Sequence, residues 1–145
     1  MYNDIYYEMS IISPFVKDDL TCLTIKDKLQ ILCAVNPISA LIEIVNCKYK
    51  INHNMLLQDI NSTTMQIYDG NELVKVDTDA ALSLLIETRI SDLKKIISDL
   101  SDHLRETFIN DINKYLDEGC YIDPNFRKTP CKPNHILKST SKFRD

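Results

Sequence analysis

The chain has 145 residues and a net charge of −4, and 44% of its residues are hydrophobic while 26% are charged. This balance is typical of a globular protein and excludes a disordered chain. The length leaves room for one domain, or for a small unit with a long helix. The N-terminal sequence MYNDIYYEMS lacks the basic start and apolar run of a signal peptide, and no apolar stretch approaches the roughly 18 residues of a membrane span. We therefore expect a cytoplasmic or nuclear protein with no membrane partner.

The cysteines agree with such a compartment. They are odd in number and scattered along the chain: Cys22, Cys33, Cys47, Cys120 and Cys131. Without a secretory signal, such cysteines are most simply reduced thiols and not a disulfide framework.

Residues 1–47 are expected to form an irregular segment followed by short helices. The first 18 residues carry aromatic and aliphatic side chains around Pro14 with no sustained period. Thr24 is a suitable N-cap for a helix that runs to Val35. The apolar face of this helix would carry Ile25, Leu29, Leu32 and Cys33.

The dipeptide Asn36-Pro37 interrupts the helical pattern, because proline disfavours helical geometry in the residue before it. Pro37 is also a good first residue for a second helix, over 38–45. The alternative is a strand over 41–45, since this segment is rich in β-branched residues.

Residues 48–77 are expected to form a β-hairpin region. Residues 65–68 and 72–76 flank Asp69-Gly70-Asn71, and Asp-Gly favours a tight turn because both residues tolerate positive φ. A loop of two or of three residues is compatible with the sequence, and the choice decides which faces pair. A weaker strand pair would join 48–51 to 55–60. The residues expected to pack the hairpin are Met65, Ile67, Leu73, Val74 and Val76.

Residues 78–118 carry the pattern of one uninterrupted helix. Asp77 or Thr78 can cap its start, Asp79 lies in the first turn, and Gly119 can end it in the left-handed conformation. A helix of about forty residues would be roughly 60 Å long. Its apolar residues recur in steps of three and four, close to the 3.5-residue repeat of a helix that follows a partner helix. We call the following set the apolar stripe: Ile86, Ile90, Leu93, Ile97, Leu100, Leu104, Phe108 and Ile112.

The apolar stripe predicts contact with another surface. Each of its side chains left in water forfeits roughly 1.5–3 kcal/mol relative to burial, so exposure of the whole stripe would exceed the stability of an ordinary domain. Charged residues such as Arg89 and Asp92 flank it. We expect the stripe to pair with protein partners in a homo- or hetero-oligomer. The alternative is that residues 5–47 fold back and cover it in a monomeric helical bundle.

Residues 119–145 form a basic, proline-containing tail that is not a continuous helix. The tail has a net charge of +4, so the rest of the chain has −8. It is either an arm that touches an acidic partner or RNA, or a solvated end of the fold. Its basic residues are Arg127, Lys128, Lys132, Lys138, Lys142 and Arg144.

A family resemblance follows from the stretch MQIYDGNELVKVDTDAALSLLIETRISDLKKIISDL, residues 65–100. A strand, a glycine-containing turn, a strand ending in Val-Asp-Thr and a capped helix with a heptad-like stripe resemble the C-terminal half of an α-type prefoldin subunit. The likeness covers residues 48–118. It implies two long helices in an antiparallel coiled coil, hairpins that assemble with sister subunits, and coiled-coil tips that hold non-native client proteins. Asn36-Pro37 departs from this pattern, because it interrupts the first long helix.

A second hypothesis is a winged-helix regulator that binds nucleic acid and dimerises through the C-terminal helix. Two short helices, a helical turn and a wing-like hairpin have the required order. However, residues 51–62 contain no Lys or Arg, and the hairpin has Lys75 against Asp69, Glu72 and Asp77. Such surfaces repel phosphates, so this hypothesis ranks below protein binding.

Catalytic and metal-binding signatures are weak. The two glycines, Gly70 and Gly119, do not form a phosphate-binding loop. Cys120, Cys131 and His135 are the best metal candidates, but they lack the closely spaced cysteine pair typical of zinc sites. We expect no catalytic residue, no metal and no cofactor.

The sequence thus predicts a mainly helical α+β protein with one or two β-hairpins followed by a long coiled-coil-type helix. Its expected function is that of a non-catalytic, chaperone-like assembly subunit that pairs with other subunits or clients.

Overall fold

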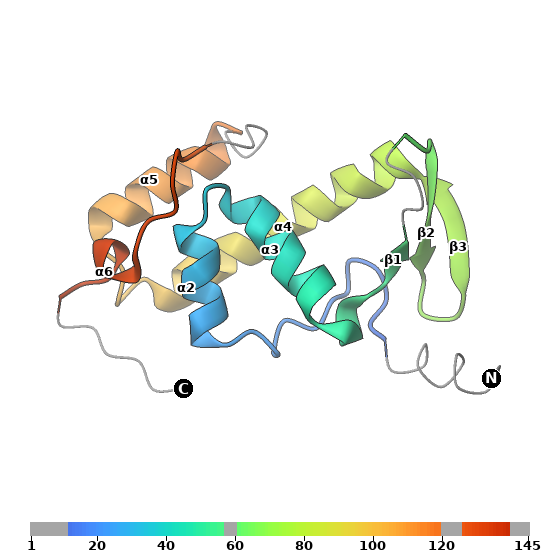
Figure 1. The fold of residues 1–145 in the computed structure, drawn as a ribbon, viewed down its shortest axis with the longest axis horizontal. Helices are drawn as coiled ribbons and strands as arrows, with labels where there is room; N and C mark the ends of the chain where they lie inside the picture. Colours follow the sequence, from blue (N-terminus) through green and yellow to red (C-terminus); the bar gives the residue numbers. More distant parts are fainter. Residues whose placement is uncertain (1–11, 57–60, 120–125, 140–145) are drawn as a thin grey trace. The chain divides into compact units, whose positions relative to one another are not determined.

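The computed structural model describes residues 12–56, 61–119 and 126–139 of a mixed, mainly helical α+β chain, in agreement with the predicted class (Figure 1). The chain divides into two compact units. Unit 1 comprises the residues up to Cys22 and Glu43–Thr88, and unit 2 comprises Leu23–Ile42 and the residues from Arg89 onward.

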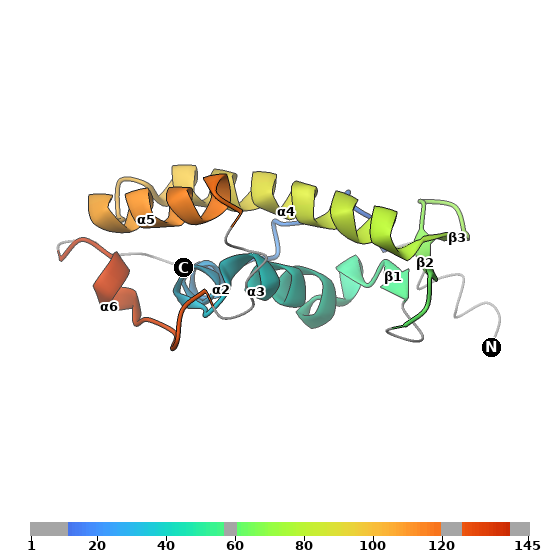
Figure 2. The ribbon, with the colours of Figure 1, turned by 90° about the horizontal axis from the view of Figure 1, so that it is seen from above.

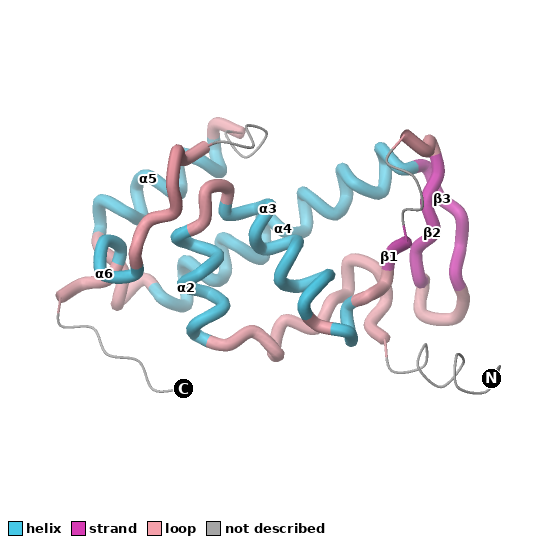
Figure 3. The backbone as a smooth tube through the Cα atoms, viewed as in Figure 1, coloured by secondary structure: helices cyan, strands magenta, loops and turns pink. Residues whose placement is uncertain are grey.

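Unit 1 contains a three-stranded antiparallel sheet in the order β1-β2-β3 (Figure 3). The strands are β1 (Met55–Leu56), β2 (Thr64–Tyr68) and β3 (Leu73–Asp77). Met65 lies opposite Val76 and Ile67 opposite Val74, which confirms the predicted hairpin.

The turn of this hairpin is longer than expected, because residues 69–72 all lie between the two strands. Asp69 Oδ1 accepts hydrogen bonds from the backbone N–H groups of Asn71 (2.8 Å) and Glu72 (2.9 Å). These bonds stabilise the ionised carboxylate and lower the pKa of Asp69. Gly70 has φ of +108°, a conformation that suits glycine.

The expected strand at 48–51 is wrong. The chain instead forms a π-helical turn, Ile44–Lys48, and a 3₁₀ turn, Lys50–Asn52. β1 pairs with β2 and not with this segment, and residues 57–60 lie outside the described residues. The physical reason lies in the asparagine side chains near these turns, whose hydrogen bonds replace a strand ladder.

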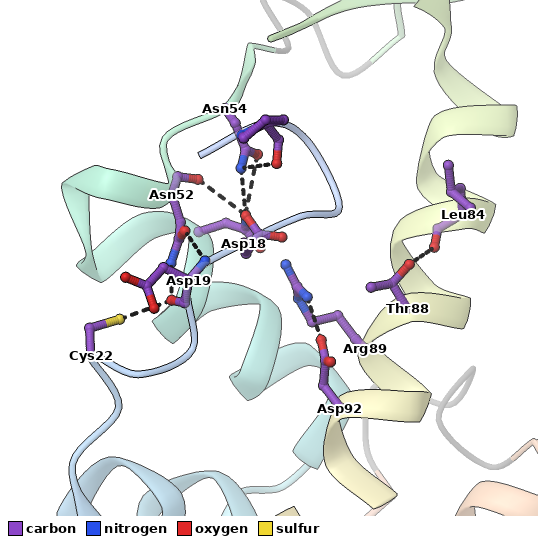
Figure 4. A network of polar contacts seen from close by, with 11 residues as sticks. Asp18, Asp19, Cys22, Asn52, Asn54, Leu84, Thr88, Arg89 and Asp92 are labelled. Carbon is purple, nitrogen blue, oxygen red and sulfur yellow. Dashed lines mark hydrogen bonds and ion pairs between the residues drawn. The ribbon is translucent and has the colours of Figure 1, made fainter. Parts of the chain in front are cut away.

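Those side chains form a buried polar network in unit 1 (Figure 4). Asn52 is fully buried, and its side chain both accepts from the N–H of Asp19 (2.8 Å) and donates to the Asp19 carbonyl (2.8 Å). Asp18 Oδ1 accepts from the side-chain amides of Asn46 (3.0 Å) and Asn54. The network therefore fixes the segment before α2 against the two turns.

Unit 2 begins with α2 (Ile25–Cys33), whose start is capped as predicted. The Asp27 N–H donates to Thr24 Oγ1 (3.0 Å), and the Thr24 N–H donates to Asp27 Oδ2 (3.1 Å). Pro37 is the first residue of α3 (Pro37–Glu43), so the helical interpretation of this segment is confirmed and the strand alternative is wrong.

The single helix predicted over 78–118 is wrong: it is two helices, α4 (Thr78–Leu100) and α5 (Glu106–Asp117). The predicted ends are confirmed, since Asp77 Oδ2 accepts from the Ala80 N–H (2.9 Å) and Gly119 has φ of +71°.

The break has a local and a long-range cause. Ser101 forms a tightened turn, with its hydroxyl donating to the Ser98 carbonyl (2.9 Å). Leu104 then makes a β-bridge with Leu137, and the Arg105 N–H donates to the Ile136 carbonyl (2.8 Å). Backbone groups of residues 103–105 that would continue the helix are therefore hydrogen-bonded to residues 136–138 instead.

That segment includes α6 (Pro133–Ile136), and it lies against α2. In Figure 2, α5 and the part of α4 from Arg89 onward form one layer of unit 2, and α2 and α6 lie in another. The buried apolar residues of unit 2 include Ile31, Leu32, Leu41, Leu93, Ile97, Leu100, Leu104, Phe108, Ile112, Tyr115, Leu116 and Ile136.

Candidate functional site

The main candidate site is an open apolar groove in unit 2, with a volume of about 610 Å³. We call it the α2 groove. One wall is the outer face of α2, and the other is the segment that precedes α6. The groove is lined by Ile25, Lys26, Leu29, Gln30, Cys33, Ala34, Val35, Pro130, Cys131 and Pro133.

The walls remain partly exposed although most of them are apolar. Ile25 and Leu29 were expected on the apolar face of this helix with Leu32 and Cys33, but they are only half-buried, because the face of α2 that packs inward carries Ile31 and Leu32. A groove that leaves aliphatic side chains in contact with water is typical of a binding surface.

The rim of the groove is basic. Lys26 is exposed on α2, and Lys132 is exposed between two lining residues of the opposite wall. The residues that line the groove include no acid, and the acid within α2, Asp27, is buried and bound in the Thr24 cap. The local field around the groove therefore favours negative charge.

The far wall is held in place by Arg127. Its guanidinium Nη1 donates to the carbonyls of Leu32 (2.6 Å) and Ala34 (3.0 Å), and its backbone N–H donates to the Val35 carbonyl (2.9 Å). A cation at the C-terminus of α2 satisfies carbonyls that have no partner within the helix. The ring of Phe126 lies 4.4 Å from that of Tyr115, which anchors the same segment to α5.

At the floor of the groove two cysteines lie together. The Cys131 N–H donates to the Cys33 carbonyl (2.9 Å), and both residues line the groove. Burial, followed by the neighbouring Cys131 side chain, raises the pKa of the Cys33 thiol to about 12. Cys33 is buried while Cys131 is half-exposed, so the two thiols differ in access to solvent.

The residues of the apolar stripe are placed differently from the prediction. Leu93, Ile97, Leu100, Leu104, Phe108 and Ile112 are buried within the chain, but Ile86 and Ile90 are only half-buried. Along the first half of α4 the buried line is shifted by one residue, through Ala81, Leu85 and Arg89.

Arg89 was expected among the charged residues that flank the apolar stripe and is instead 1% exposed. Its Nη1 donates to Asp92 Oδ2 at 2.6 Å, one turn further along α4 (Figure 4). Nearby, the Thr88 hydroxyl donates to the Leu84 carbonyl (2.8 Å). Charged residues are rarely buried without a partner, and a sequence pattern does not show that a partner is present. The pattern therefore placed this arginine at the flank of the stripe and not in the core.

The predicted hairpin residues are also split. Met65 is buried, and Ile67, Val74 and Val76 are half-buried on the same face. Leu73 is 46% exposed, so its expected packing role is wrong. Leu73 pairs with Tyr68 across the hairpin. Both residues line a second apolar hollow in unit 1, and Ile12, the first described residue, lines it as well.

The basic residues of the tail do not act as one group. Arg127 belongs to the fold, whereas Lys128, Lys132 and Lys138 are exposed. Lys142 and Arg144 lie outside the described residues.

Among the described residues no group of three or more His, Cys, Asp or Glu side chains is arranged to hold a metal. Cys120 lies outside them, and His135 Nδ1 accepts from the Lys132 N–H (3.4 Å). Within the same part of the chain, no helix is both long and apolar enough to cross a membrane.

The groove and the cysteine pair were missed by the sequence interpretation. No local pattern joins α2 to a segment about 100 residues later, and the only signal was the pair of prolines, Pro130 and Pro133, that keeps this segment extended beside α2. The chain matches no protein-family model, no curated protein and no solved structure.

Proposed function

We propose that this chain is a non-catalytic protein-interaction module and that its binding surface is the α2 groove. The partner supplies a segment that carries both apolar and acidic side chains. The observation that carries the proposal is the combination of aliphatic walls and exposed lysines at one groove.

The aliphatic walls supply affinity. Ile25, Leu29 and Val35 are partly exposed to water, and each would gain from burial under a partner side chain at about 25 cal/mol per Å² of apolar surface. A groove of about 610 Å³ has room for two or more apolar side chains.

The lysines supply selectivity. Lys26 lines the groove on α2, and the exposed Lys132 lies in the chain between Cys131 and Pro133 of the other wall, so carboxylates that flank an apolar anchor would meet positive charge. Rim charges of this kind act mainly on association rate and partner choice. The lining contains no aromatic side chain on which a base could stack, so an acidic protein segment fits it better than RNA.

The assembly hypothesis based on one long coiled-coil helix has lost its main support. The helix is broken after Leu100, and most of the apolar stripe is buried inside the chain. Among the earlier alternatives, a small helical interaction protein agrees better with this burial. The prefoldin-like and winged-helix hypotheses both stay predictions.

The test is selection from a displayed library of random peptides against the immobilised full-length chain. We expect enriched peptides to combine aliphatic and acidic residues. Their binding should fall at least tenfold in Leu29→Asp and several-fold in Lys26→Glu, because the first substitution puts a charge in the wall and the second reverses the rim.

Leu82→Asp is the matched control, since Leu82 is an exposed leucine on α4 outside the groove and should leave binding unchanged. Circular dichroism of each variant checks that the fold is retained. Enriched peptides that bind Leu29→Asp and Lys26→Glu as tightly as the unmodified chain would overturn the proposal, as would enrichment of basic sequences.

A further inference from the structure

The cysteine pair has the placement that a disulfide needs. The Cys131 N–H donates to the Cys33 carbonyl (2.9 Å), so the two backbones lie side by side at this point. Residues that pair by backbone hydrogen bonds across two strands have α carbons about 5.5 Å apart, within the range that disulfides span. Both residues also line the same groove. Bond formation therefore requires side-chain rotation and no rearrangement of the backbone.

The pair is also accessible from one side. Both residues line the α2 groove, which is open to solvent. Cys131 is half-exposed, so a reagent that enters the groove meets its thiol first, whereas Cys33 is buried. The other described cysteines, Cys22 and Cys47, belong to unit 1, while this pair lies within unit 2.

We propose that Cys33 and Cys131 form a redox-sensitive thiol pair, which a low-molecular-weight disulfide such as oxidised glutathione converts into an intramolecular disulfide. This inference does not depend on the proposed binding function.

The reaction proceeds by two exchanges. The Cys131 thiolate attacks one sulfur of the small disulfide, a bond forms between them, and the first small thiolate leaves and takes up a proton. Cys33 then loses its proton and attacks the Cys131 sulfur, which releases the second small thiol. Two protein thiols are oxidised and one small disulfide is reduced to two thiols.

Access and acidity assign the two roles. The exposed Cys131 is the attacking thiol. Cys33 is the resolving thiol, and its raised pKa makes the second exchange the slower one. The product closes a loop of about 100 residues and ties the far wall of the groove to the end of α2.

The test uses the full chain equilibrated with oxidised glutathione, then blocked with an alkylating reagent and digested. Before blocking, the intact chain should be lighter by about 2 Da, and after blocking and digestion one cross-linked peptide should contain Cys33 and Cys131. Reduced glutathione in excess should return it to the dithiol.

Two serine variants separate the steps. Cys33→Ser should accumulate a stable glutathione adduct on Cys131, since no resolving thiol remains. Cys131→Ser should leave Cys33 unmodified, because Cys33 is buried. Cys47→Ser is the control and should not change the cross-link, since Cys47 is exposed and belongs to unit 1. A chain that stays reduced or carries only mixed disulfides would overturn the proposal, as would a cross-link through another cysteine.

Discussion

Tyr115 and Asn36 are joined by a hydrogen bond from the phenol hydroxyl to the amide oxygen, although 79 residues separate them in the sequence. The same hydroxyl accepts from the backbone N–H of Ile38 (3.0 Å), and Asn36 Oδ1 accepts from the N–H of Ser39 (3.3 Å). A side chain of α5 therefore completes the N-terminal cap of α3.

Replacing Tyr115 by phenylalanine should lower the free energy of unfolding by about 1–2 kcal/mol, because a buried N–H in the first turn of α3 loses its acceptor. Urea denaturation followed by circular dichroism measures the change. Combined with Asn36→Ala, the two effects should fall short of additivity by about 1 kcal/mol. Simple additivity would show that the two side chains are not coupled.

Arg127→Lys should lower the free energy of unfolding by about 1–2 kcal/mol, and Arg127→Ala by somewhat more. The reason is that an ammonium group cannot reproduce the planar contacts of Nη1 with the Leu32 and Ala34 carbonyls. The measurement is chemical denaturation. Lys128→Ala is the matched control, since Lys128 is exposed, and it should change stability by less than about 0.5 kcal/mol. Equal effects at the two positions would show that Arg127 has no structural role.

Asn52→Ala should be among the most destabilising single changes in unit 1, at about 2–3 kcal/mol. It removes the acceptor of the Asp19 N–H and one of the two donors to the Asp19 carbonyl, and it empties the fully buried position of the Asn52 side chain. Asn71→Ala, in the exposed turn of the hairpin, is the control and should be nearly neutral. The midpoint of thermal unfolding distinguishes the two. If Asn52→Ala were as mild as Asn71→Ala, the network would not stabilise the fold.

The raised pKa of Cys33 predicts a pH dependence. The unfolded chain releases this proton near pH 9 and the folded chain near pH 12, so stability is intact below pH 9 and is lost as pH rises towards 12. Alkylation by iodoacetamide in the folded chain should therefore leave Cys33 unmodified at pH 9, while the exposed Cys47 reacts. Mass spectrometry of the digested protein reports both sites. Modification of Cys33 as fast as Cys47 at pH 9 would contradict the assigned burial.

The sequence predicted those parts of the fold that depend on neighbouring residues. The cap at Thr24, the helix start at Pro37 and the left-handed stop at Gly119 each follow from residue type and backbone preference. The hairpin between β2 and β3 was predicted for the same reason, since Asp69 and Gly70 mark its turn.

The remaining features depend on contacts between distant residues. Ser101 and Asp102 weaken a helix only slightly, and the break becomes clear only when Leu104 is seen to pair with Leu137. The buried position of Arg89 could not be predicted from the sequence either. The neighbouring Ile90 is apolar and continues the three- and four-residue spacing, so the pattern assigns burial to Ile90 and not to Arg89. The candidate site was missed because Cys33 and Cys131 share no local pattern.

The bridge between Leu104 and Leu137 also constrains the order of folding. The turn between α4 and α5 is stabilised by hydrogen bonds to the backbone of residues 136–138. These residues are synthesised after all the other helices and strands described here. A nascent chain that ends before them can form α4 but cannot close this turn. During synthesis Leu104 would then lack its β-bridge partner until Leu137 emerges, and incompletely packed apolar residues in such an intermediate favour aggregation.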